Sequence, residues 1–264
     1  MNDQNKDIIR IITVVVYNRP QYFKRCLLSI IKNNLKGWKI FFNIEPSEHI
    51  EVIKYLIKDI IPNEVDFKIK INPNKTDLQN HCYLALDSAF NANGKLIIYL
   101  EEDVVISSDV TRLADWYYMQ NRKGIMCLNL LYGECGGINH ISKEDFPDYI
   151  IKTKQFNSYG IVLTDKQWLK YFNPYWFDYS HGFTDDDGNL LLGWDWAIFK
   201  HNLKDDKKLF VLQPLLARAN HIGRRGAFCT PGFYDKTFKD IKISNIKNKL
   251  MYTLINEKNM EKLL

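Results

Sequence analysis

The first 107 residues alternate between four short, mostly apolar runs and stretches whose apolar residues recur at helical spacing. Pro20, shortly after the first run, suits the first turn of a helix. Strands that alternate with helices indicate a mainly parallel sheet with helices on its faces. We therefore predict an α/β, Rossmann-like fold in which the carboxyl ends of the strands share one edge of the sheet. The four runs are residues 11–16, 40–44, 65–71 and 96–100.

The fourth run ends in three consecutive carboxylates, Glu101, Glu102 and Asp103. An unbroken apolar run is typical of a strand buried on both faces, and ligands bind where such strands end. Adjacent carboxylates repel each other, and Mg²⁺ or Mn²⁺ relieves that repulsion while leaving positions for substrate phosphates. From these residues alone, a divalent cation site and a solvated acidic turn before a helix near Asp109 are equally good interpretations.

Asp195 lies between two tryptophans in the segment Gly193-Trp194-Asp195-Trp196, at the expected start of a helix. Large aromatic neighbours exclude water, which raises the pKa of a carboxyl group and makes it a better base near neutral pH. The indoles could also stack on a sugar ring. The residues alone favour the alternative, in which Asp195 caps the helix and the tryptophans belong to the core.

A basic loop with glycines covers residues 218–226 and contains Arg218, His221 and Arg224. Glycine allows the backbone to approach a ligand closely, and cations with an imidazole suit a diphosphate. A neutral imidazole could instead bind a metal beside carboxylates. Solvated loop charges are the alternative interpretation.

Single polar residues follow the predicted strands of the first half, where a nucleotide would lie in a parallel sheet. Arg19 offers hydrogen-bond donors, Glu45 an acceptor and His81 a stacking or hydrogen-bonding edge. Each alone is more often structural, so their common location carries the argument. Thr76 and Gln79 predict a capping box that opens the helix before the acid-ended strand.

Composition limits the class of protein and its surroundings. A chain of 264 residues with 46% hydrophobic residues can bury the core of one sizeable unit or of two fused halves. The net charge of +5 is too small to demand nucleic acid but favours anionic ligands. No apolar stretch reaches about 20 residues and no signal peptide is visible, so we expect a cytoplasmic protein without stable membrane insertion. Five scattered cysteines argue against a disulfide framework: Cys26, Cys82, Cys127, Cys135 and Cys229.

The order of these motifs resembles the GT-A glycosyltransferases, most closely the family of N-acetylglucosaminyltransferase I and protein O-mannose N-acetylglucosaminyltransferase. The resemblance covers about residues 11–239. It comprises the acidic triplet at 101–103, the Trp194-Asp195 pair, the Arg-x-x-x-x-Gly-x-x-Gly pattern at 218–226 and the segment Phe233-Tyr234-Asp235. Arg19, Glu45 and His81 fall on positions that contact the nucleotide in the family.

The resemblance implies a role for each matching residue. Asp103 would be the metal ligand, Glu101 would face the donor sugar and Asp195 would be the catalytic base. The remaining candidates would bind the donor: Arg19, Glu45, His81, Glu102, Trp194, Arg218, His221 and Arg224. Two positions depart from the family, because Glu102 replaces an aspartate and Glu45 is one methylene longer than the acid expected at the uracil site.

Together these features predict a metal-dependent, inverting glycosyltransferase of the GT-A fold with a smaller acceptor-side half. It would use Mn²⁺ or Mg²⁺ to move a sugar, with N-acetylglucosamine as one candidate, from a UDP-sugar to a hydroxyl of a glycan or glycoconjugate. Alternatives are transfer to hydroxylated bases in DNA, a sugar-nucleotide nucleotidyltransferase, and a non-catalytic carbohydrate-binding protein. The oligomeric state is left open.

The expected organisation is a GT-A domain over residues 1–242, divided into a nucleotide-binding half (1–107) and an acceptor-binding and catalytic half (108–242). An amphipathic helical extension is expected over 243–264. Asp185-Asp186-Asp187-Gly188 is interpreted as a surface turn, because the alternating ligand spacing of a calcium loop is missing.

Overall fold

The computed structural model describes residues 8–120, 123–131, 146–178, 183–184, 190–191, 193–204, 206, 208–226, 229–244 and 251–255. The acidic segment 185–188 and most of the expected C-terminal extension therefore lie outside the described residues. The helices are α1 (Pro20–Ile30), α2 (Ile50–Ile60), α3 (Leu78–Asn91), α4 (Val110–Gln120), α5 (Asp165–Gln167), η3 (Trp168–Phe172), η4 (Asn173–Tyr175), α6 (Trp194–Phe199), η6 (Lys200–Lys204) and α7 (Pro231–Thr237). The strands are β1 (Arg10–Val16), β2 (Trp38–Ile44), β3 (Phe67–Ile71), β4 (Leu96–Glu101), β5 (Val104–Ile106), β6 (Ile125–Asn129), β7 (Tyr149–Thr153), β8 (Ile161–Thr164), β9 (Phe183–Thr184), β10 (Leu190–Leu191), β11 (Phe210–Pro214), β12 (Ala219–His221) and β13 (Thr253–Ile255).

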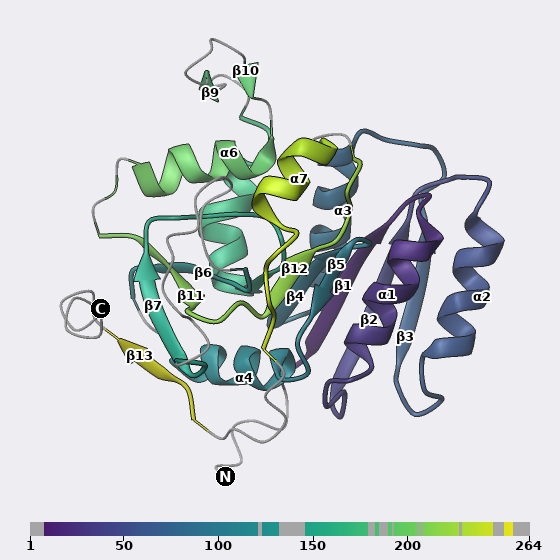
Figure 1. The fold of residues 1–264 in the computed structure, drawn as a ribbon, viewed down its shortest axis with the longest axis horizontal. Helices are drawn as coiled ribbons and strands as arrows, with labels where there is room; N and C mark the ends of the chain where they lie inside the picture. Colours follow the sequence, from purple (N-terminus) through teal and green to yellow (C-terminus); the bar gives the residue numbers. More distant parts are fainter. Residues whose placement is uncertain are drawn as a thin grey trace.

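A mixed sheet of nine strands forms the centre of the molecule, in the order β13-β7-β11-β6-β8-β4-β1-β2-β3 (Figure 1). β1 runs parallel to both β2 and β4, β2 is parallel to β3, and β11 is parallel to β6. β8 is antiparallel to β4 and β6, and β7 is antiparallel to β11. The predicted α/β fold with a mainly parallel sheet is thus confirmed.

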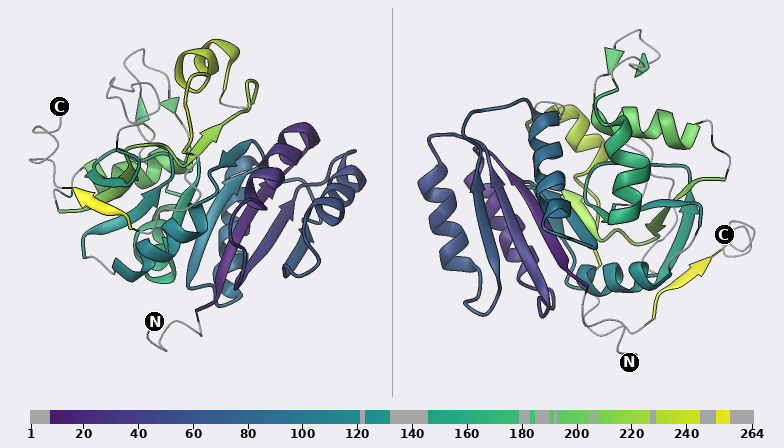
Figure 2. Two further views of the ribbon diagram at one scale, coloured as in Figure 1. Left: turned by 60° about the horizontal axis from the view of Figure 1, so that its bottom comes forward. Right: turned by 180° about the vertical axis from the view of Figure 1, so that it is seen from behind.

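Successive residues of β1 face two different helical layers. Ile12, Val14 and Val16 pack in one cluster with residues of α1, α2 and α4. Ile11 and Val15 pack in the other with residues of α3, η3 and α6. Figure 2 shows α3 on the side of the sheet opposite to α1. Because side chains alternate along a strand, an unbroken apolar sequence is what a strand between two helical layers requires.

The chain departs from the predicted local structure in two places. Asp77, not Thr76, caps α3, because its side chain accepts a hydrogen bond from the Asn80 backbone N–H at 2.8 Å. Near the C-terminus, Thr253–Ile255 form strand β13, parallel to β7, where a helix was expected. The local pattern indicated amphipathicity, but the open edge of β7 offers backbone hydrogen bonds that sequence periodicity does not reveal.

No helix in the part of the chain that the structure describes is both long and apolar enough to span a membrane.

Candidate active site

The ends of three neighbouring strands place predicted site residues at one edge of the sheet. β1 runs parallel to β2 and β4, so all three strands end at this edge. Arg19 follows β1, Glu45 follows β2, and Glu101 is the last residue of β4. The strand order also reverses at β1, because β2 and β3 lie on one side of it and β4 on the other. In open α/β sheets, ligands bind at such a point.

Arg19 joins the end of β1 to the acidic end of β4. Its Nε lies 2.6 Å from Glu102 Oε1, and its Nη1 lies 2.7 Å from Asp103 Oδ2. The other oxygen of Glu102 accepts a hydrogen bond from the Tyr17 backbone N–H at 2.8 Å. Both carboxylates are buried. Glu102, which the resemblance assigned to donor binding, therefore fixes the connection between β1 and α1.

Asp103 contacts Arg19 and His221 through one oxygen only. Oδ2 lies 2.7 Å from Arg19 and 3.0 Å from His221 Nε2, whereas Oδ1 is buried without a hydrogen-bond partner. Burial alone would raise the pKa of Asp103, but the hydrogen bond from His221 and the charges of His221 and Arg19 hold that pKa below its usual range. A buried oxygen without a partner is costly, and a cation would supply the missing interaction.

A divalent cation that takes few protein ligands fits these residues. In the described ranges, no three His, Cys, Asp or Glu side chains gather into a metal cage. Mg²⁺ is usually held by one or two carboxylates plus water and substrate phosphates, and Mn²⁺ shares its preference for oxygen. Asp103 Oδ1 would be the ligand, with His221 beside it.

The loop after β12 lies directly over Asp103. β12 pairs with β5, with His221 opposite Val104, and the Ile222 backbone N–H donates to the Asp103 carbonyl at 2.8 Å. A Cβ atom added to Gly223 would lie 2.0 Å from Asp103 Oδ2, so this approach requires glycine. His221, for which the sequence left metal binding beside carboxylates as one interpretation, therefore contacts Asp103 of the acidic triplet.

Arg224 lies at the outer side of this loop. Its Nη2 lies 2.7 Å from Asp235 Oδ2 on α7, with both side chains exposed. The first residue of the basic loop, Arg218, does not reach the site. Its side chain is fully buried, its Nε lies 2.9 Å from Asp109 Oδ2, and it also donates to the carbonyls of Leu216 and Pro147. Arg218 therefore stabilises the fold through its ion pair with Asp109 and does not contact a donor.

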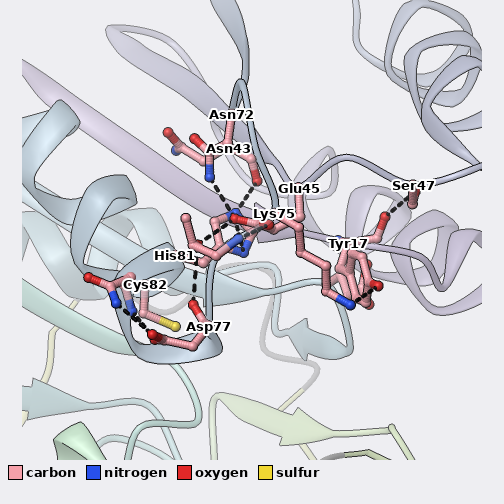
Figure 3. Close-up of polar contacts among 12 residues, drawn as sticks. Tyr17, Asn43, Glu45, Ser47, Asn72, Lys75, Asp77, His81 and Cys82 are labelled. Carbon is pink, nitrogen blue, oxygen red and sulfur yellow. Dashed lines mark hydrogen bonds and ion pairs between the residues drawn. The ribbon is translucent and has the colours of Figure 1, made fainter.

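Glu45 and His81 form a second group at the end of β2 (Figure 3). Glu45 Oε1 accepts hydrogen bonds from the Asn72 amide at 2.7 Å and the Thr76 hydroxyl at 2.8 Å, and Oε2 accepts from the Thr76 backbone N–H at 2.8 Å. His81 Nδ1 lies 3.9 Å from Glu45 Oε1, while Nε2 donates to the Asn43 carbonyl at 3.0 Å. Glu45 thus holds the segment between β3 and α3 against β2.

Acidification should destabilise the protein through His81. Burial lowers the pKa of His81, against smaller opposite effects of the Glu45 charge and the hydrogen bond to Asn43. The unfolded histidine takes up a proton at about pH 6.5. Because the pKa of His81 is lower in the folded than in the unfolded protein, neutral His81 stabilises the fold above this pH. That stability is lost as the pH falls towards the pKa of His81 in the folded protein. We expect urea denaturation to show a falling free energy of unfolding from pH 7 to 5, with a shallower slope in His81→Gln. An identical slope in the variant would contradict this assignment.

Asp195 is the second residue of α6 and lies beside a buried aromatic cluster. Trp194, predicted to contact the donor, is 4% exposed and stacks on Trp176 with ring centroids 4.3 Å apart. It also meets the Tyr99 ring of β4 edge to face at 5.9 Å. Trp194 therefore belongs to the core, where it fixes the start of α6 against β4.

The surroundings of Asp195 suit a base. Burial raises the pKa of Asp195, against the opposing hydrogen bonds from the Ser158 hydroxyl and the Trp196 backbone N–H. Burial and the charge of Asp103 also raise the pKa of Glu101, to about 8, and the Asp195 charge contributes in the same direction. Asp195 thus lies near enough to Glu101 to influence the protonation of Glu101. A carboxyl group with a raised pKa is better matched to proton transfer near neutral pH.

Sequence patterns gave no sign of several residues that shape the site. Ser158 donates to Asp195 and Asn72 donates to Glu45, yet neither belongs to a motif, and Thr76, predicted only as a helix cap, also binds Glu45. Only the pairing of the strands could have identified Ser158 as a neighbour of the site. β8 is antiparallel to β4 with Ile161 opposite Tyr99, so the residues just before β8 lie beside the end of β4.

Known structures share this architecture. Residues 1–349 of TarS from S. aureus align with a TM-score of 0.51 at 11% identity, covering 77% of this chain and 58% of that one. GalNAc-T7 in complex with UDP, GalNAc and Mn²⁺ aligns with a TM-score of 0.53 at 13% identity, covering 85% of this chain and 46% of that one. The chain thus spans about half the length of these proteins.

These likenesses show that the chain has the GT-A fold. No family model matches the chain, and no curated protein matches its sequence.

Proposed function

We propose that this chain is a metal-dependent, inverting glycosyltransferase that moves a sugar from a UDP-sugar to a hydroxyl of a glycan or glycoconjugate. The observation that carries the proposal is a charged cluster around Asp103 at the strand ends, with the separate base candidate Asp195 near Glu101. TarS has been solved with UDP, and GalNAc-T7 with UDP and Mn²⁺. These complexes support the choice of donor and metal.

Each part of the site would do one part of the reaction. Asp195 accepts the proton of the acceptor hydroxyl while that oxygen bonds to the anomeric carbon and the bond from this carbon to the phosphate oxygen breaks. A single displacement of this kind inverts the configuration. Arg19 and His221 stabilise negative charge on the leaving UDP. A divalent cation at Asp103 would supply further charge stabilisation when bound.

The nucleotide and the acceptor would occupy different halves of the chain. We assign the nucleotide to residues 1–107, with the uracil near Glu45 and His81, and the acceptor to residues 108–242. The second half also supplies His221 to the diphosphate, with Arg224 at the rim of the diphosphate site. Both oxygens of Glu45 accept hydrogen bonds from Asn72 and Thr76. Glu45 would therefore orient the segment between β3 and α3 for binding of the uracil. N-acetylglucosamine stays the candidate sugar on the motifs shared with the N-acetylglucosaminyltransferase I family.

Asp103→Asn should weaken binding of Mn²⁺ to the UDP complex by more than about tenfold, since the amide lacks the ligand charge. Isothermal titration of Mn²⁺ into protein saturated with UDP measures this directly. Asp115→Asn is a matched control, because Asp115 on α4 pairs with Arg10 at the amino end of β1, away from the carboxyl ends of the strands. Equal Mn²⁺ affinity in Asp103→Asn and Asp115→Asn would remove Asp103 as the metal ligand.

A further inference from the structure

The carboxylate of Asp195 is held from two sides by different parts of the chain. Its Oδ2 accepts a hydrogen bond from the Ser158 hydroxyl at 3.0 Å, and its Oδ1 accepts one from the Trp196 backbone N–H at 2.9 Å. Trp196 lies on the same helix as Asp195, whereas Ser158 lies 37 residues earlier, in the turn before β8. The Ser158 contact therefore fixes the rotation of the carboxylate relative to the sheet.

Ser158 is itself held rigidly. It is 7% exposed, and its carbonyl accepts a hydrogen bond from the Gly160 N–H at 2.8 Å. Asn157, 1% exposed, donates from its side chain to the Leu131 carbonyl at 3.3 Å. Gly160 has φ +87°, a backbone conformation that residues other than glycine rarely adopt. Its carbonyl accepts a hydrogen bond from the Leu130 N–H at 2.9 Å. The turn before β8 is thus anchored to the strand β6 side of the sheet, independently of α6.

The backbone next to Asp195 leaves room for one orientation of the carboxylate. A Cβ atom added to Gly193 would lie 2.5 Å from Asp195 Oδ1 and 3.4 Å from Trp196 Cδ1. Any side chain at position 193 would therefore push the carboxylate away from its bond with the Trp196 N–H. Gly193 and Ser158 act on the same group from different sides.

We propose that Ser158 is the positioning residue for Asp195, and that its hydroxyl holds the carboxylate in the orientation that receives the acceptor proton. This inference rests on the proposed function, in which Asp195 is the base. An ionised carboxylate has about four lone-pair sites, so the hydrogen bonds from Ser158 and Trp196 orient Asp195 without exhausting its capacity to accept the acceptor proton. The other titratable groups whose protonation responds to Asp195 are Glu101 at the end of β4 and Cys82 on α3.

Ser158→Ala tests the proposal through activity. Loss of a hydrogen bond to a charged group should lower kcat by about tenfold or more, with the KM for the donor unchanged. The acidic limb of the pH profile should move to higher pH, because the ionised carboxylate loses a donor that favours it. Ser158→Thr, which keeps a hydroxyl, should recover most of the rate, and Gly193→Ala should lower kcat without moving Ser158.

Ser29→Ala is the matched control, because Ser29 is also 7% exposed and its hydroxyl bonds to Cys26 and Ile106, away from Asp195. It should leave the pH profile in place. A Ser158→Ala enzyme with the kcat and pH profile of the wild type would overturn the proposal.

A second measurement does not depend on activity. The ¹³C carboxyl resonance of Asp195, identified by its loss in Asp195→Asn, should titrate at higher pH in Ser158→Ala than in the wild type. An unchanged midpoint would overturn the positioning role, whether or not the wild type transfers sugar. Absence of transfer with the expected shift in midpoint would instead count against the proposed function alone.

Discussion

Replacing Asp195 by asparagine should lower kcat by roughly 10²–10⁴-fold, the usual contribution of a positioned general base. The amide keeps the shape of the carboxylate but cannot accept the proton of the acceptor hydroxyl. Donor binding should be unchanged, because the charged cluster of Arg19, Asp103 and His221 does not include Asp195. Steady-state kinetics with saturating donor, together with calorimetric binding of UDP, separate the two effects.

Asp165→Asn is a matched control for this variant. Asp165 is a partly exposed carboxylate whose Oδ2 lies 2.6 Å from Lys95 Nζ, at the opposite end of β4 from the acidic triplet. We expect it to have the kcat of the wild type. If Asp195→Asn retained wild-type transfer, Asp195 would lose its role as the base, even if UDP still bound.

Arg218→Ala should destabilise the protein by about 3–5 kcal/mol, because it leaves the buried Asp109 carboxylate without its ionic partner. The Tyr252 hydroxyl also donates to Asp109 Oδ2 at 3.0 Å. This hydrogen bond joins the segment before β13 to the start of α4. Equilibrium urea denaturation at neutral pH measures the loss. UDP binding per folded molecule should persist, which distinguishes a structural tie from a donor contact.

Arg224→Ala provides the comparison within the same loop. Its ion pair with Asp235 joins two exposed side chains, so its loss should cost only about 0–1 kcal/mol. Equal destabilisation by the two substitutions would contradict the contrast between buried and exposed arginines drawn from the structure.

Local patterns were sufficient to predict the first half of the fold. The runs that became β1, β2 and β4 are buried between helices, whereas β3 is a partly exposed edge strand. The alternation of strands with helices implied that the carboxyl ends of the strands share an edge. The grouping of Arg19 with Glu102 and Asp103 follows from that edge alone. The position of His221 could not be predicted from this edge, because it depends on the pairing of β12 with β5.

Residues whose roles depend on distant partners escaped prediction. Arg218 sits in a glycine-containing basic loop like a phosphate ligand, but Asp109, 109 residues away, takes up its charge. Trp194 has an aromatic ring of the kind that stacks on sugars, yet the face of that ring packs against Trp176. Ser158 contacts Asp195 because β8 turns back along β4, an antiparallel pairing that the strand pattern does not encode.

The most direct test of the central claim is a thermal unfolding screen with nucleotide sugars, each in the presence of Mn²⁺ or of a chelator. A UDP-sugar at about 100 times its Kd should stabilise the folded protein by about 2.7 kcal/mol. For a chain of this size, that corresponds to a rise in Tm of roughly 5–10 °C. The account predicts this rise for a UDP-sugar with Mn²⁺ and its loss with the chelator. The same Tm for every nucleotide sugar, with and without Mn²⁺, would contradict it.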